Sequence, residues 1–231
     1  MAVKVGILGA GYMGTIHARN LAADGRVAVL GVADVAPERA EALAREVGAT
    51  ACGGVDGLLE LGIDALYITT PNTQHTAAAV RALAANVHVF SEKPMATSPA
   101  EARQIAAAAA ASRGLYQVGH NRRFAPVYRF ARALVDKGLV PYSANVKMNR
   151  GELKNPPWVA NREITGGFLY ESTIHLLDMI RWLMGEVSEV VCRAEANVYG
   201  EPDSFSALLT FVSGHSATFS SCAHAAWGFP F

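Results

Sequence analysis

The feature that most constrains the fold is a set of three glycines close to the start of the chain. The stretch "KVGILGAGYMG" places Gly9, Gly11 and Gly14 in a GxGxxG pattern, directly after an apolar run and before a helical pattern. A turn of this composition between a buried strand and a helix is typical of the first βα unit of a doubly wound parallel sheet. We therefore expect an α/β Rossmann domain at the amino terminus.

The rest of the first 120 residues alternates short apolar runs with longer amphipathic ones. The expected strands lie at 4–9, 27–34, 64–70, 87–91 and 115–120, and the expected helices at 12–24, 37–47, 73–85 and 98–113. This alternation predicts a parallel sheet covered by helices on both faces. Pro37 suits a first helical turn, and Thr97 or Ser98 followed by Glu101 resembles a capping box.

The pattern changes near residue 120. A helix is expected at 125–137 and another at 168–184, among strands expected at 141–150, 187–200, 204–213 and 215–224. This order predicts an α+β domain with an open, mostly antiparallel sheet, so we divide the chain into domains 1–120 and 121–231. Residues 151–166 have the Pro, Asn and Gly density of a long surface loop.

Composition narrows the functional classes. The 231 residues are 51% hydrophobic, and 20 basic side chains balance 20 acidic ones, so nucleic acid is not an expected partner. The three cysteines lack the CxxC spacing of a metal or redox site, which favours a reducing cytoplasm. No apolar window is long enough for a membrane span or a signal segment, so we expect a soluble cytoplasmic protein.

The glycine turn is the expected phosphate-binding element. Gly9 permits the tight turn, Gly11 lets the backbone approach a pyrophosphate, and Gly14 lets the helix pack closely. The free N–H groups of the first helical turn, which includes Tyr12 and Met13, attract the phosphate charge. We therefore predict that these five residues bind a dinucleotide.

Asp34 decides which dinucleotide is favoured. It ends the second expected strand 20 residues after Gly14, where a carboxylate accepts hydrogen bonds from the adenosine ribose. The same charge repels a 2′-phosphate, so NAD is favoured over NADP, although Arg39 could soften that choice. The alternative is that Asp34 is only a helix N-cap.

Two further strand ends should face the cofactor, since ligands bind at the carboxyl ends of parallel strands. One end supplies Thr70, Pro71, Asn72 and His75, and the other supplies Glu92, Lys93 and Pro94. Pro94 restricts the conformation of Lys93, which favours a positioned lysine over an ordinary solvated Glu-Lys pair. We expect Glu92 and Lys93 to contact the cofactor.

A second set of polar residues falls on the helix expected at 168–184. Glu171, His175 and Asp178 share one face, at i, i+4 and i+7. The stripe could be a solvated surface with an ordinary ion pair, a metal site, or a histidine acid/base oriented by a carboxylate. Trp158, in the preceding loop, fits a core anchor as well as a substrate platform. We expect no bound metal.

The motifs together resemble a known family. "GILGAGYMG", "TTPNTQH", "SEKPMATS", "GHNRRFAP" and "GGFLYESTIHLLDMIRWL" occur in this order, and the chain resembles the Gfo/Idh/MocA oxidoreductases, which include glucose-fructose oxidoreductase and inositol dehydrogenase. The resemblance implies hydride transfer between NAD(P) and a CH–OH group of a sugar, polyol or cyclitol. It also implies a homo-oligomer, a dimer or tetramer, formed through the carboxyl-terminal sheet.

The resemblance also assigns residues. Lys93 matches the lysine of the EKP motif, His175 matches the acid/base histidine, and Glu171 stands where the family usually has aspartate. We predict Lys93, His175 and Glu171 as catalytic residues, and Lys93, His175, Arg123 and Trp158 as substrate contacts.

Two features depart from the family pattern. Thr173 replaces the usual glycine between Glu171 and His175, and the chain stops at "CAHAAWGFPF", where the family's sheet continues. The sequence therefore predicts an incomplete second domain with an unpaired sheet edge. These departures leave two alternatives to a dehydrogenase: an inactive dinucleotide-binding sensor, or an NAD-dependent glycosidase.

Overall fold

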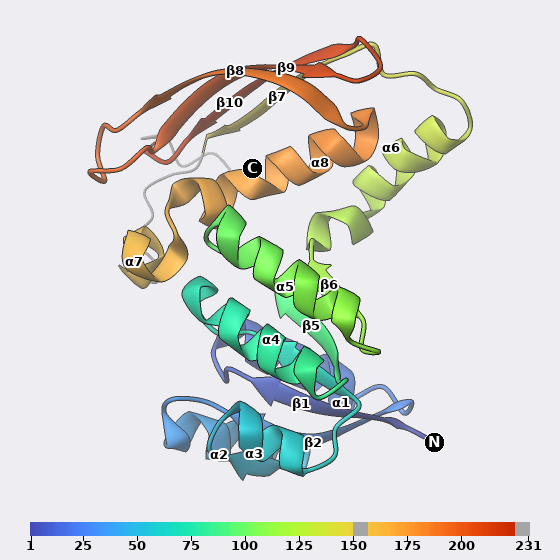
Figure 1. Cartoon of the computed structure of the whole chain (residues 1–231), viewed down its shortest axis with the longest axis vertical. Helices are drawn as coiled ribbons and strands as arrows, with labels where there is room; N and C mark the ends of the chain where they lie inside the picture. Colours follow the sequence, from blue (N-terminus) through green and yellow to red (C-terminus); the bar gives the residue numbers. More distant parts are fainter. Residues whose placement is uncertain (150–156, 225–231) are drawn as a thin grey trace. The chain divides into compact units, whose positions relative to one another are not determined.

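The protein is described by a computed structural model that covers residues 1–149 and 157–224. It divides into two compact units, Met1–Gly119 and His120–Phe231, and each is described by itself (Figure 1).

The first unit is built on a six-stranded sheet in the order β3-β2-β1-β4-β5-β6. The strands are β1 Val3–Leu8, β2 Val27–Ala33, β3 Thr50–Cys52, β4 Ala65–Ile68, β5 His88–Glu92 and β6 Tyr116–Gly119. Every neighbouring pair is parallel, which confirms the predicted doubly wound sheet. The strand order reverses between β1 and β4, and this is the position at which such sheets bind ligands.

Helices cover both faces of this sheet. They are α1 Tyr12–Ala22, α2 Pro37–Val47, α3 Val55–Glu60, α4 His75–Ala84 and α5 Pro99–Ala111, with a 3-10 turn at Asn72–Gln74. On one face Ile7 and Val32 pack with Ala18 of α1 and Leu43 of α2. The strand alternation turns other residues to the opposite face, where α3, α4 and α5 bury a second cluster.

Two short elements of this unit were not expected. β3 has three residues and α3 has six, and both fall between the helix expected at 37–47 and the strand expected at 64–70, where no element was predicted. Segments of this length hold too few residues to show a hydrophobic period, and β3 is defined by its pairing with β2.

The second unit contains a four-stranded sheet in the order β7-β10-β9-β8. Its strands are β7 Ser143–Asn149, β8 Val187–Glu195, β9 Ser204–Phe211 and β10 Ser216–Cys222. The β8–β9 and β9–β10 pairs are antiparallel and β7–β10 is parallel, which confirms the mostly antiparallel prediction. Helix α8, Ile174–Met184, runs along one face (Figure 1) and buries Leu176 and Ile180 against the sheet.

The remaining elements connect this sheet and helix. A 3-10 turn at Asn121–Phe124 leads into α6, Pro126–Asp136. Of the predicted loop 151–166, the first six residues lie outside the described part of the chain, and the rest forms a 3-10 turn at Pro157–Ala160 and α7 at Arg162–Thr165. The helix expected from 168 begins with a π-helical turn, η4 Leu169–Thr173, before α8.

The amino end of α5 forms the capping arrangement that its sequence predicts. The Ser98 hydroxyl accepts a hydrogen bond from the Glu101 backbone N–H at 3.3 Å. The Glu101 carboxylate in turn accepts from the Thr97 backbone N–H at 3.0 Å and from its hydroxyl at 2.9 Å. These bonds satisfy donors that the helix itself cannot pair.

Replacing the capping hydroxyl of Ser98 should lower the stability of the first unit. We expect Ser98→Ala to lower the free energy of unfolding by about 1 kcal/mol, because the Glu101 N–H loses its acceptor. Ser98→Asp is the matched control, since aspartate caps equally well. Urea denaturation followed by circular dichroism measures both; equal losses in the two variants would show that the cap is not the cause.

Candidate functional site

The turn between β1 and α1 is shaped by two glycines that leave no room for side chains. Gly9 has a φ of 103°, and a Cβ there would lie 2.8 Å from the Thr69 carbonyl carbon. A Cβ on Gly14 would lie 1.8 Å from the Gly9 carbonyl oxygen. Helix α1 therefore sits directly against the turn that precedes it, as the glycine pattern predicts.

Gly11 differs, because a Cβ added to it would have no other atom within 4 Å. It is the N-cap of α1, without a side-chain cap bond, and the first turn carries no acidic residue. Exposed N–H groups and the helix dipole make such a terminus an anion site. Tyr12, 81% exposed, and the half-buried Met13 begin the helix beside that open space. These residues fit a pyrophosphate.

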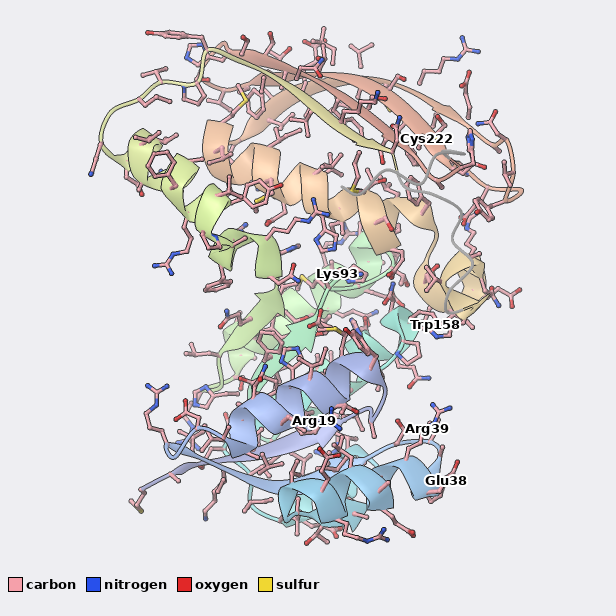
Figure 2. The ribbon with its side chains drawn as sticks, turned by 180° about the vertical axis from the view of Figure 1, so that it is seen from behind. Arg19, Glu38, Arg39, Lys93, Trp158 and Cys222 are labelled. Atoms are coloured by element: carbon pink, nitrogen blue, oxygen red, sulfur yellow. The ribbon has the colours of Figure 1, made fainter. Side chains whose placement is uncertain are left out.

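Asp34 follows β2 and joins two turns. Its Oδ2 accepts from the Ala10 backbone N–H at 2.7 Å, and its Oδ1 accepts from the Ala36 N–H at 2.9 Å. The N-cap of α2 is Ala36, so the alternative role of Asp34 as that cap is not what the structure shows. A carboxylate has about four lone-pair sites, which leaves capacity for ribose hydroxyls. Glu38 and Arg39 lie at the start of α2 (Figure 2).

The residues after β4 are held by partly buried hydrogen bonds. The Thr69 hydroxyl donates to the carbonyl oxygens of Leu8 and Gly9, at 3.0 and 2.7 Å. The expected cofactor residues Thr70 and Pro71 continue this loop into Asn72, which is 4% exposed.

His75 is fully buried, with Nδ1 2.8 Å from the Pro94 carbonyl oxygen and Nε2 2.9 Å from that of Thr70. Burial lowers the pKa of His75, which favours the neutral ring. With no exposed surface, His75 can influence a cofactor only by holding the Thr70 and Pro94 backbones.

The end of β5 presents Glu92 and Lys93. Lys93 is partly exposed (Figure 2), and its backbone N–H donates to Glu92 Oε2 at 3.3 Å. The other oxygen, Oε1, lies 2.8 Å from His17 Nε2 on α1. His17 was not among the expected site residues; the available signal was its position three residues after Gly14, on the same face of α1. The Lys93–Pro94 peptide is cis.

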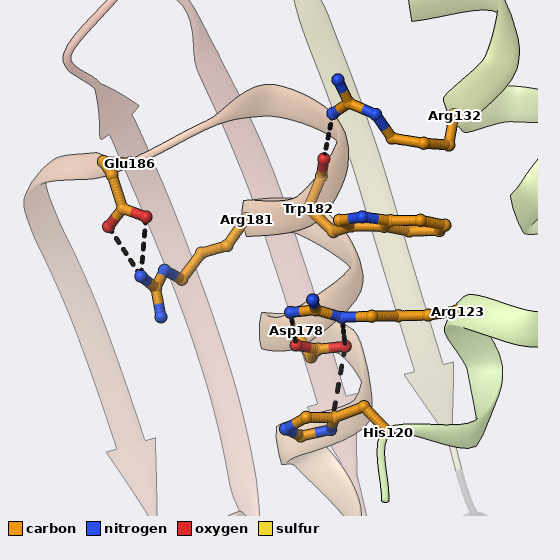
Figure 3. A network of polar contacts seen from close by, with 7 residues as sticks. All are labelled: His120, Arg123, Arg132, Asp178, Arg181, Trp182 and Glu186. Atoms are coloured by element: carbon orange, nitrogen blue, oxygen red, sulfur yellow. Dashed lines mark hydrogen bonds and ion pairs between the residues drawn. The ribbon is translucent and has the colours of Figure 1, made fainter. Parts of the chain in front are cut away.

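In the second unit, a polar network connects α8 to the segment that follows residue 119. The Arg123 guanidinium donates to both oxygens of Asp178, with Nε–Oδ2 at 2.9 Å and Nη2–Oδ1 at 2.5 Å. It also lies over the Trp182 ring, at 5.7 Å, and His120 Nδ1 is 3.7 Å from Asp178 Oδ2 (Figure 3). Arg123, which we expected at the substrate, is thus the ion-pair partner of a carboxylate that is 9% exposed.

Glu171 and His175 lie at the start of the same helical run. Glu171 is buried in the π-helical turn, and His175 is half-buried in the first turn of α8. Thr173, which replaces the usual family glycine, is fully buried with its hydroxyl 2.9 Å from that of Ser221 on β10. The substitution therefore adds a side-chain hydrogen bond between this helix and the sheet.

A buried carboxylate lies behind the glycine pair that precedes this helix. Gly166 and Gly167 have φ values of 80° and 103°, and a Cβ on Gly167 would lie 2.3 Å from Glu201 Oε2. Burial raises the pKa of Glu201, although its carboxylate also accepts from the Phe168 backbone N–H and faces Arg162 at 3.8 Å. The backbone at Gly167 thus comes close to Glu201.

Trp158, the other expected substrate contact, is 39% exposed beside the buried Val159. Within residues 1–149 and 157–224, no three His, Cys, Asp or Glu side chains are grouped so as to hold a metal ion. Across the same residues no helix has the length and apolar character needed to cross a membrane.

Comparison with known proteins agrees with this geometry. Residues 3–120 match the model of an oxidoreductase family with an NAD-binding Rossmann fold, and residues 128–230 match the GFO/IDH/MocA C-terminal domain. The chain is 31% identical to an inositol 2-dehydrogenase of Rhizobium meliloti (strain 1021) in an alignment of 239 positions. The alignment covers 99% of this chain and 71% of the relative.

Two solved structures show the same fold. One is GenD2 from gentamicin A biosynthesis in complex with NAD, with 27% identity, a TM-score of 0.87, and coverage of 98% of this chain and 67% of that one. The other is a myo-inositol dehydrogenase from Corynebacterium glutamicum ATCC 13032, with 25% identity, a TM-score of 0.84, and coverage of 99% and 70%.

The fold and the open helix terminus define the class, which is an oxidoreductase with an NAD-binding Rossmann domain. Within that class, the chain belongs to the Gfo/Idh/MocA family.

Alanine at two glycines should separate cofactor binding from folding. We expect Gly11→Ala to leave the free energy of unfolding within about 1 kcal/mol of wild type, because its Cβ meets no protein atom. The same methyl group would enter the space in which we expect the pyrophosphate, and it should weaken NAD binding about tenfold or more. Gly14→Ala should instead destabilise the unit by about 1–3 kcal/mol, since its Cβ overlaps the Gly9 carbonyl.

Calorimetric titration with NAD and urea denaturation provide the two measurements. If Gly11→Ala binds NAD as tightly as the wild type, the pyrophosphate does not lie at this turn.

Proposed function

We propose that the protein is an NAD-dependent dehydrogenase that acts on a CH–OH group of a sugar, polyol or cyclitol. Two features at one edge of the parallel sheet carry this proposal. The N-terminus of α1, which follows β1, is open and suited to binding an anion, and Lys93 follows β5, two strands away from β1. Two of the three similar proteins named above are inositol dehydrogenases, which supports a substrate with several hydroxyl groups and does not favour the sensor or glycosidase alternatives.

Each of the candidate residues would have its own role in binding or in proton transfer. The first turn of α1 holds the pyrophosphate, and Asp34 accepts hydrogen bonds from the adenosine ribose. Lys93 contacts the substrate hydroxyl near the nicotinamide, and His175 accepts the hydroxyl proton, with Glu171 orienting the imidazole. Bound NAD supplies the acceptor for the hydride that leaves the carbon.

Removing the proposed proton-handling residues should abolish turnover while leaving the fold intact. We expect Lys93→Ala and His175→Gln each to lower kcat about 100-fold or more on an active polyol, because general acid/base groups contribute rate factors of this size. NADH absorbance during incubation with NAD and a panel of inositols and sugars measures the rate. Lys137→Ala, at an exposed lysine after α6, is the matched control.

Turnover that survives both substitutions would contradict these roles. Turnover absent from the wild type on every member of the panel would contradict the proposed substrate class.

We also propose that the protein forms a homo-oligomer through the sheet face opposite α8, and that it resides in the cytoplasm, with Cys52, Cys192 and Cys222 as free thiols. Strand alternation turns Leu209 into the core at 3% exposure and leaves its neighbour Leu208 45% exposed. Leu208 pairs with Val191, which is 61% exposed, and the two line a shallow hollow on this face. A second copy would cover this apolar row.

A charge in that row should prevent assembly. We expect Val191→Asp and Leu208→Asp to convert the oligomer to monomer, because a buried unpaired carboxylate opposes association. Val212→Asp, at a valine that is 74% exposed beyond β9, should leave assembly unchanged. Light scattering during size-exclusion chromatography reports the mass. A monomeric wild type, or a row variant that assembles normally, would overturn this proposal.

A further inference from the structure

One partly buried contact connects the two halves of the candidate cofactor site within the first unit. His17 lies on α1, three residues after Gly14, and its Nε2 is 2.8 Å from Oε1 of Glu92 at the end of β5. The two side chains are only 21% and 14% exposed. An ionised carboxylate can only accept, so His17 Nε2 carries the proton and donates. The bond spans 75 residues of sequence.

Aromatic side chains fix the imidazole in place. Its ring centroid is 5.6 Å from that of Tyr67 on β4 and 5.3 Å from that of Phe90 on β5. Tyr67 and Phe90 themselves stack at 4.7 Å. Phe90 fills the space that a side chain at position 119 would need, since a Cβ on Gly119 would lie 2.9 Å from its ring. Such packing leaves the histidine little freedom to change rotamer.

The alternation of β5 explains why these groups meet. Phe90 and Glu92 are two residues apart and so project from the same face of the sheet, toward α1. Ser91, between them, is fully buried on the other side. The second oxygen of Glu92 accepts from the backbone N–H of Lys93 at 3.3 Å. A direct series of bonds therefore runs from α1 through His17 and Glu92 to the backbone of Lys93.

We propose that His17 is a positioning residue for Lys93, and that it acts by holding the Glu92 carboxylate. The helix whose first turn faces the pyrophosphate then also fixes the direction of the lysine at the neighbouring strand end. Without the imidazole, the carboxylate is free to turn, and the Lys93 backbone N–H loses an acceptor that is held in place. This inference rests on the proposed function of Lys93.

The chain offers a graded set of variants. His17→Leu removes the donor and keeps an apolar side chain of similar reach, while His17→Gln keeps an N–H that can donate to Glu92. Arg19→Gln is the matched control on the same helix (Figure 2), because it removes only an ion pair with Glu46 whose partners are 59% and 44% exposed. Glu92→Gln breaks the same contact from the other side if His17→Leu does not fold.

The first readout needs no substrate and no cofactor. Each protein is acylated briefly with acetic anhydride, and the rates at Lys93 and at the exposed Lys137 are compared by peptide mass spectrometry. We expect His17→Leu to change the rate at Lys93 about threefold or more relative to Lys137, since the backbone bond that positions Lys93 loses its fixed acceptor. His17→Gln and Arg19→Gln should stay within about 1.5-fold of wild type.

The second readout is steady-state kinetics on an active polyol. We expect His17→Leu to lower kcat about tenfold or more with the KM for NAD changed less than about threefold, and His17→Gln to restore most of kcat, because a misdirected lysine harms chemistry more than binding. A general loss of structure would move KM, kcat and the melting temperature together and would not be restored by glutamine.

The outcomes separate this inference from the proposed function. Lys93 acylation that is the same in His17→Leu, Glu92→Gln and wild type would overturn the positioning role, whatever the activity. Altered acylation with no polyol oxidation by the wild type would contradict the proposed function and leave the His17–Glu92–Lys93 connection standing.

Discussion

The close approach of α1 to the turn before it is the constraint on which the first unit depends. A single carbon added to Gly14 would lie 1.8 Å from the Gly9 carbonyl oxygen, so helix and strand can meet this tightly only with glycine there. Because α1 packs so closely on the sheet, its N-terminus lies at the edge of the sheet. His17, in the second turn of α1, contacts Tyr67 on β4 and Glu92 on β5. Asp34 secures the same turn by accepting from the Ala10 N–H at 2.7 Å.

The second unit relies on paired charges at a helix instead of on glycine. Asp178 is 9% exposed, and burying a carboxylate without a partner is costly, so the two hydrogen bonds from Arg123 offset the cost of its burial. The partnership raises the pKa of Arg123 through its hydrogen bond to Asp178. The face of α8 that carries His175 is thereby tied to the segment around residue 120 within this unit, while Leu176 and Ile180 anchor its other side in the sheet.

Most of the fold could be predicted from the sequence, because its long elements have clear periods and explicit end signals. The capping residues of α5, Pro37 at the start of α2 and the glycines after β1 each specify a local geometry that the structure contains. β3 and α3 escaped prediction because they are too short to show a period. The π-helical turn at Leu169–Thr173 also escaped, since its i→i+5 bonding has no distinct pattern of apolar residues.

The sequence indicates which types of residue lie near the candidate site, but it does not indicate which distant side chains bond to one another. The need for glycine at positions 9 and 14 follows from backbone chemistry that one sequence already specifies. The pairing of Arg123 with Asp178, of Thr173 with Ser221 and of His17 with Glu92 joins residues 48 to 75 positions apart, and no local signal connects them. Such pairs arise from topology: sheet alternation and helix placement decide which distant polar groups meet.

The central claim is that the β1–α1 turn and Asp34 together form an NAD site, and calorimetric titration of the unmodified protein with NAD and with NADP tests it most directly. The account predicts saturable binding of NAD, and binding of NADP about tenfold weaker or more, because the Asp34 carboxylate repels a 2′-phosphate. No binding of either dinucleotide, or a preference for NADP, would contradict it.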